Sequence, residues 1–97
     1  MFQTITMAAG QRLEFYESGD FFRLMAATAA VTVEYYKNGA EVAEAVGVGA
    51  GYAERFIGSN FDRVAITSAT AQTIQVATRF GNEVLYDTPP NGQVTVT

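Results

Sequence analysis

The strongest structural signal in the chain lies between Phe61 and Phe80, where apolar and polar residues alternate in two runs. The apolar face of these runs comprises Val64, Ile66, Ile74, Val76 and Phe80. Alternation with a period of two, rich in Val, Ile and Thr, is typical of half-buried strands. The short polar segment Ser68-Ala69-Thr70 separates the two runs as a turn. We therefore expect a β-hairpin with one face in a core and the other toward solvent or a partner.

The rest of the chain repeats this pattern in short segments. Further strands are expected at Phe2 to Met7, Arg12 to Glu17, Phe21 to Ala27, Val31 to Tyr36, Tyr52 to Ile57 and Glu83 to Asp87. Gln93 to Thr97 is either a last short strand or a free arm. The nearly continuous apolarity of Phe21 to Ala27 indicates burial on both faces. Short strands spaced by about 8–12 residues, with turn residues between them, are typical of an antiparallel sandwich or barrel. We expect an all-β antiparallel sandwich forming one domain over residues 1–97.

Asn38-Gly39 is the clearest hairpin turn in the chain, because a type I′ turn needs positive φ at both central residues. The segment after it, Ala40 to Val46, is ambiguous. Its composition favours a helix in isolation, but a helix of two turns is marginal without packing. Glycines follow at positions 47, 49 and 51. We therefore favour a strand paired back across Asn38-Gly39, and a short helix is the alternative.

Composition excludes several classes of protein. The 97 residues carry ten acids and six scattered bases, a net charge of −4, which argues against nucleic acid as a partner. The absence of cysteine excludes disulfides and thiolate metal sites and fits the cytosol or a particle assembled there. We find neither a secretory leader nor an apolar run approaching the ~20 residues of a membrane span.

Composition also limits the chemistry that the chain can perform. Without histidine or cysteine, imidazole acid–base catalysis, Ser-His-Asp triads and thiol nucleophiles are excluded. The candidate carboxylates are Glu14, Glu17, Asp20, Glu41 and Glu44, which we expect on solvated strand faces or in turns. The run from Gly47 to Gly51 lacks the Gly-Lys-Ser/Thr of a phosphate loop. We predict no enzyme activity, no catalytic residues, no cofactor and no metal.

Three tyrosines are the candidate contact residues. In the expected registers Tyr16 and Tyr36 point away from the core, together with either Phe56 or Ile57. Exposed aromatic side chains often mark protein contacts or sugar-stacking platforms. Tyr52 joins Tyr16 and Tyr36 as a stacking candidate if the domain binds carbohydrate.

Three segments carry a resemblance to a known class of protein. They are GDFFRLMAATAAVTVEYYKNG, GVGAGY and FDRVAITSATAQTIQV, which begin at Gly19, Gly47 and Phe61. With these segments the region from Gly19 to Asp87 resembles small all-β virion proteins of bacteriophages. The resemblance implies a jelly-roll-like sandwich that assembles on a capsid or tail, often as a trimer or higher oligomer. The resemblance implies no catalytic residue. Cupin enzymes share the jelly roll, but this chain lacks every histidine that binds their metal.

From the resemblance we expect a bacteriophage structural protein, a head-decoration or cement-type subunit located in the virion and assembled in the host cytoplasm. Its partners would be copies of itself, as a homotrimer or other homo-oligomer, and virion proteins such as the major capsid protein. Residues 88–97 are expected to form a C-terminal arm that would contribute to assembly. The alternative is a carbohydrate- or receptor-binding module of a phage spike or tail.

Overall fold

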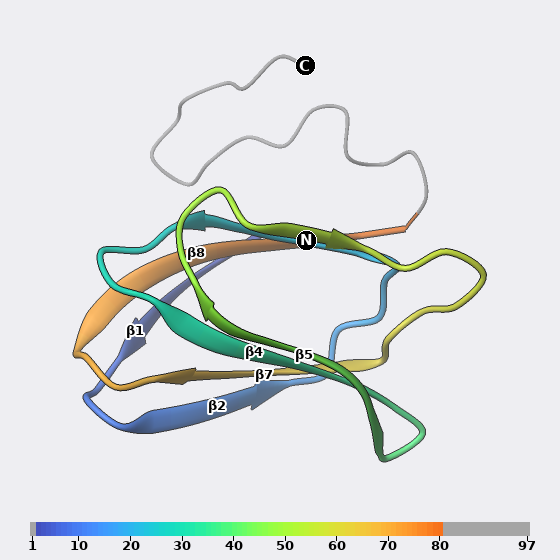
Figure 1. The fold of residues 1–97 in the computed structure, drawn as a ribbon, viewed down its shortest axis with the longest axis horizontal. Coiled ribbons are helices and arrows are strands. Elements are labelled where there is room, and N and C mark those ends of the chain that lie inside the picture. The colour runs from blue at the N-terminus through green and yellow to red at the C-terminus, as the bar shows by residue number, and fades with distance from the viewer. Residues whose placement is uncertain (1, 81–97) are drawn as a thin grey trace.

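A computed structural model describes residues 2–80, which fold into strands joined by short connections (Figure 1). The strands are β1 (Phe2–Met7), β2 (Gln11–Phe15), β3 (Phe21–Ala26), β4 (Val31–Lys37), β5 (Ala40–Val48), β6 (Ala53–Arg55), β7 (Arg63–Ser68) and β8 (Gln72–Arg79). Residues 2–80 contain no helix, and hence none long enough to cross a membrane. The all-β prediction is confirmed for this part of the chain.

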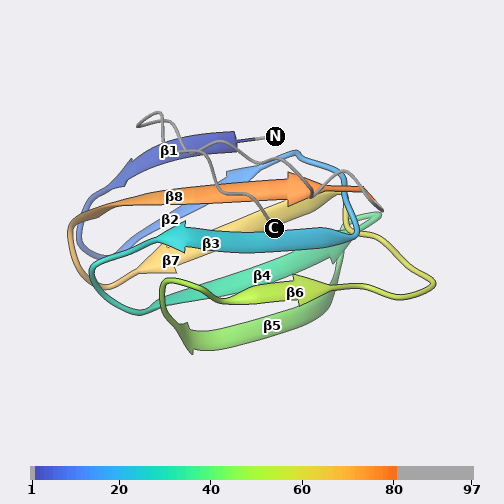
Figure 2. The same cartoon turned by 90° about the horizontal axis from the view of Figure 1, so that it is seen from above.

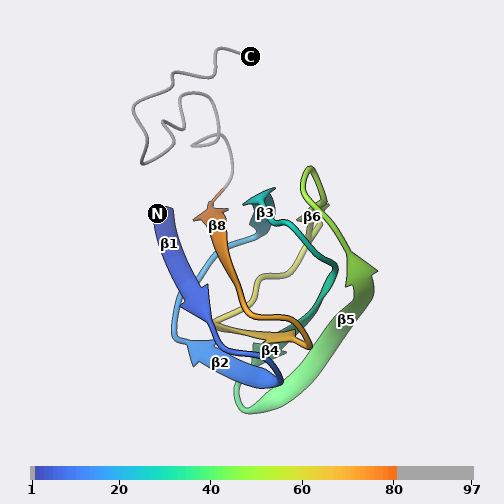
Figure 3. The ribbon, with the colours of Figure 1, turned by 90° about the vertical axis from the view of Figure 1, so that its left-hand side faces the viewer.

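The strands form two antiparallel sheets of four, packed face to face. Their orders are β1-β8-β3-β6 and β2-β7-β4-β5. Figure 2 looks onto the first sheet, and Figure 3 shows the two sheets as separate layers. The chain changes layer at every connection except the one between β4 and β5. The predicted antiparallel sandwich is therefore confirmed, with two four-stranded layers.

The core fills the space between the layers. It comprises Met7, Phe22, Leu24, Val31, Val33, Tyr35, Phe61, Val64, Ile66, Ile74 and Val76. On β4 the alternation is as predicted, with Val31, Val33 and Tyr35 buried. The prediction for Phe21 to Ala27 was wrong, because only Phe22 and Leu24 are buried there. The outer face of β3 has no third layer over it within residues 2–80, so its other side chains keep contact with water.

The hairpin at Asn38-Gly39 is confirmed. The backbone φ is 54° at Asn38 and 82° at Gly39, the positive values that a type I′ turn needs. The ambiguous segment after it belongs to strand β5, which pairs antiparallel with β4 along its length. Tertiary pairing therefore outweighs the local helical preference of this alanine- and glutamate-rich segment.

The segment from Phe61 to Phe80 is not the hairpin that its alternation predicts. Its two strands, β7 and β8, lie in opposite sheets, so the connection between them crosses the core layer. The Ser68 hydroxyl donates to the Thr70 carbonyl and accepts from the Thr70 N–H. It also accepts a hydrogen bond from Gln72 Nε2 at 2.9 Å. These contacts shape a three-residue arch rather than a turn within one sheet.

Several predicted strand boundaries differ from the observed ones. The strand expected from Arg12 to Glu17 ends at Phe15, and the one expected from Tyr52 to Ile57 shortens to β6. The expected strand at Glu83 to Asp87, the segment from Gln93 to Thr97 and the C-terminal arm at 88–97 lie outside the described residues.

Candidate functional site

The outer face of the sheet β2-β7-β4-β5 gathers most of the charged side chains that the sequence analysis singled out. Strand register places Glu14, Ala65, Glu34 and Glu44 opposite one another across the four strands. Arg63 pairs with Tyr36 in the same sheet. Ala65 has so small a side chain that longer groups from β2 and β4 can meet above it. The result is a continuous polar network on one face of the sandwich.

Two arginines organise this network. Arg12 on β2 forms an ion pair with Glu14 and a second one with Glu34, whose Oε1 lies 3.2 Å from Arg12 Nε. Arg63 on β7 pairs with Glu14 at 3.2 Å. The hydrogen bond from Arg12, with Arg63 nearby, holds the pKa of Glu14 below its ordinary value. These pairs are partly exposed, so water screens them and they contribute little to stability.

Tyr36 and Tyr16 meet at Arg63. The Arg63 guanidinium carbon lies 4.1 Å from the centre of the Tyr36 ring and 5.9 Å from that of Tyr16. The Tyr36 hydroxyl accepts a hydrogen bond from Arg12 at 2.9 Å and donates to Glu34 at 3.2 Å. Tyr16 remains 76% exposed. Two of the three predicted contact tyrosines are therefore brought together on one surface.

Tyr52 lies elsewhere and serves the core. Its hydroxyl is 2.8 Å from that of Tyr35 and donates to Glu54 at 3.3 Å. Its ring centre is 6.1 Å from that of Phe22. Burial raises the pKa of Tyr35, and partial burial raises the pKa of Tyr52, so both hydroxyls stay protonated at neutral pH. This arrangement makes Tyr52 an anchor for the connection between β5 and β6 rather than an exposed platform.

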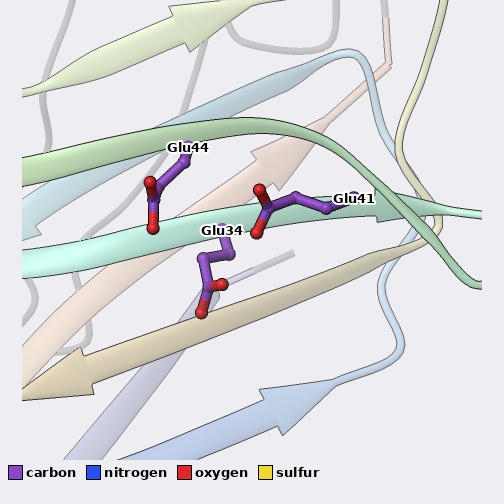
Figure 4. A group of neighbouring side chains, drawn as sticks. All are labelled: Glu34, Glu41 and Glu44. Carbon is purple, nitrogen blue, oxygen red and sulfur yellow. The ribbon is translucent and has the colours of Figure 1, made fainter.

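Three carboxylates stand together beside the network (Figure 4). Glu34, Glu41 and Glu44 each have an oxygen within 4.8 Å of the others. A hydrogen bond with Glu34 raises the pKa of Glu41. Partial desolvation opposes ionisation of Glu34, but hydrogen bonds from Glu41, Arg12 and Tyr36 outweigh it and lower its pKa. Calcium prefers six to eight oxygen ligands, and Arg12 already neutralises Glu34. The three carboxylates therefore offer oxygen ligands of the kind that calcium prefers, but too few to complete its coordination.

The described residues offer no concave site for a small molecule. No pocket is present within residues 2–80, whereas cofactor and substrate sites are normally clefts of several hundred cubic ångströms. The outer face of this sheet is instead a strand surface that carries charged and aromatic side chains. We find no match between this chain and any known family, curated protein or solved structure.

Sequence reasoning missed the part played by the two arginines. Arg12 and Arg63 are 51 positions apart and appear scattered in the sequence. The available signal was the period-two placement of Arg12 with Glu14, and of Glu34 with Tyr36, which puts each pair on one face. Only the pairing of β7 with both β2 and β4 brings these faces together.

Proposed function

We propose that this chain is a non-enzymatic structural subunit of a bacteriophage virion, a capsid decoration or stabilisation protein that acts through symmetric contacts between copies. The proposal rests on the resemblance to phage virion proteins and is supported most directly by the strand order of the sandwich. The lack of histidine and cysteine, and the absence of a pocket in residues 2–80, favour contact over catalysis.

The strand orders β1-β8-β3-β6 and β2-β7-β4-β5 support a jelly roll. An eight-stranded jelly roll is a sandwich built from two Greek keys, in which first and last strands are neighbours and successive strands alternate between sheets. β1 lies beside β8, β2 lies beside β7, and only β4 and β5 follow each other within one sheet. Viral capsid domains use this architecture, as do lectins and cupins.

The partners in this proposal are copies of the same chain, as a homotrimer or other homo-oligomer, and the major capsid protein. The location is the virion, with assembly in the host cytoplasm. Nucleic acid and membrane have no part in it, in keeping with the net charge of −4.

One observation favours a second candidate, a carbohydrate- or receptor-binding module of a spike or tail. Tyr16 and Tyr36 lie together at Arg63 on an open face, and Tyr16 is largely exposed. Aromatic rings of this kind can stack on sugars. The absence of a groove beside them in residues 2–80 and the inward placement of Tyr52 make this the weaker candidate.

Two measurements on the full chain separate the candidates. Sedimentation velocity should give an oligomer, and the protein should co-sediment with capsids assembled from the major capsid protein of the same phage. On a glycan array the wild-type chain should bind no sugar more strongly than a Tyr16→Ala variant does. A chain that remains monomeric at high micromolar concentration and binds no capsid would overturn the proposal. Glycan binding that depends on Tyr16 would support the second candidate.

A further inference from the structure

The four edge strands of the sandwich are protected to very different degrees. An unpaired sheet edge exposes backbone N–H and C=O groups, and proteins usually guard it with charge, bulges, proline or shortness. β5 carries Glu41 and Glu44, and its pairing with β4 shifts register twice. β6 is only three residues long and includes Glu54 and Arg55. These two strands have the expected protection.

The two edges on the other side of the sandwich differ from each other. β2 is five residues long and carries Arg12 and Glu14. β1 carries no charged residue and no proline, and it pairs with β8 over six residues without a register shift. Figure 3 shows β1 at the border of its sheet, next to β8. Among the described residues, β1 is therefore the edge strand that lacks every usual protection.

Within the described residues, one side of the β1 backbone has no strand paired to it. In an antiparallel ladder alternate residues turn their backbone groups away from the neighbouring strand. Within residues 2–80 the backbone of β1 has β8 as its only ladder partner, and no other backbone hydrogen bond reaches it. Thr4 and Thr6 are exposed on the outer face, while Ile5 and Met7 face the core.

The apolar residues beside this edge are incompletely covered. Ile5 on β1, and Leu13 and Phe15 on β2, pack against the core but remain only half-buried. They belong to the two strands that border the same side of the sandwich (Figure 3). A partner added along β1 would remove more of this apolar surface from water, which is favourable.

A second copy of the chain is a suitable partner, because β1 itself carries no charge. Copies of a chain with a net charge of −4 repel one another, and no charged residue occurs between Phe2 and Gln11. Two identical strands that pair antiparallel about a two-fold axis place like residues close together, which is costly for charged strands such as β5. For β1 the same pairing brings threonine near threonine, a favourable cross-strand contact.

We propose that β1 pairs antiparallel with β1 of a second copy, so that two four-stranded sheets join into one continuous eight-stranded sheet. This inference rests on the self-association in the proposed function and assigns it a surface. The contact is isologous, with the same patch used on both copies. It produces a dimer, or links larger units in pairs, so the assembled mass is an even multiple of 10.4 kDa.

The test uses opposite charges on the full chain. A Thr4→Lys/Thr6→Lys variant and a Thr4→Glu/Thr6→Glu variant each place like charges against their own copies. Each should weaken self-association at least tenfold in sedimentation equilibrium, while far-UV circular dichroism stays that of the wild type. An equimolar mixture of the two variants should associate again, because Lys then faces Glu. Val46→Lys on β5, at a position 71% exposed, is the matched control and should leave association unchanged.

The outcomes separate this inference from the proposed function. An oligomer that tolerates both β1 variants, or that only Val46→Lys disrupts, overturns the β1 pairing and leaves self-association standing. A wild-type chain that is monomeric overturns both. If the Lys and Glu variants fail to restore association when mixed, and deletion of residues 93–97 abolishes it, the β1–β1 pairing is overturned. The C-terminal segment is then the partner of the β1 edge.

Discussion

Gly19 stands at a close crossing of three segments, and we predict that its replacement by alanine destabilises the fold. A Cβ atom at this position would lie 2.6 Å from the Arg79 carbonyl oxygen and 3.1 Å from Cζ of Phe61. Gly19 also exchanges backbone hydrogen bonds with Phe61, at 3.0 and 2.9 Å. Because ordinary contacts at Cβ are 3.4–4 Å, the end of β8 or the fully buried Phe61 ring must move.

The expected cost follows from these contacts. Overpacking of this kind costs about 1–3 kcal/mol, and a disturbed backbone hydrogen bond costs roughly 1 kcal/mol more. The loss of glycine entropy in the unfolded chain offsets about 0.4–1 kcal/mol. We therefore expect the free energy of unfolding to fall by about 2–3 kcal/mol. For a domain of this size the melting temperature then falls by roughly 10–20 °C.

Gly49→Ala is the matched control. Gly49 has no atom within 4 Å of a built Cβ, and its φ lies outside the positive range. This variant should be neutral or more stable by up to about 1 kcal/mol. Urea unfolding followed by far-UV circular dichroism, at one fixed protein concentration, measures both variants. Equal stability of the two alanine variants would refute the steric argument.

Three further predictions concern a buried amide, a turn and a carboxylate pair. Gln72→Ala should lower the free energy of unfolding by roughly 2–3 kcal/mol, because the Gln72 amide forms hydrogen bonds with two backbone N–H groups and a carbonyl of the β3–β4 connection. Gln75→Ala on the same strand should lower it much less in the same urea melts. Gly39→Ala should lower stability by about 1 kcal/mol, since φ is 82° there; an unchanged urea midpoint would contradict this. Glu41 has a raised pKa beside Glu34, so its ionised form opposes folding and stability rises as pH falls through that pKa. Glu41→Gln should therefore be more stable than wild type at pH 7, with the difference vanishing in acid; a constant difference in a pH series of urea melts would argue otherwise.

The parts of the fold that depend on neighbours in sequence were predictable. Val31, Val33 and Tyr35 are buried as their alternation indicates, because side chains on a strand face opposite sides in turn. Asn38-Gly39 forms the expected turn, because its backbone conformation depends on those two residues. The outward direction of Tyr16 and Tyr36 follows from the same local rule.

The parts that depend on pairing between distant strands were not predictable. The segment from Phe61 to Phe80 has the alternation of a hairpin, but the same alternation also suits two strands in opposite sheets. The pairing of β7 with β2 and β4, and of β8 with β1 and β3, places the two strands in opposite sheets. The arch at Ser68, bonded by Gln72, joins them. Likewise no pattern near Arg12 indicates that it meets Glu34, since β7 must first lie between their strands.

By itself, then, the sequence determined the all-β class, the direction of side chains on β4 and the turn at Asn38-Gly39. These features arise from period-two alternation and from backbone preferences that act within a few residues. Tertiary structure alone decided which strands share a sheet, that Tyr52 bonds Tyr35 in the core, and that β1 is an unprotected edge within residues 2–80. Each of these depends on contacts between residues far apart in the chain, which a local pattern of apolar and polar residues does not encode.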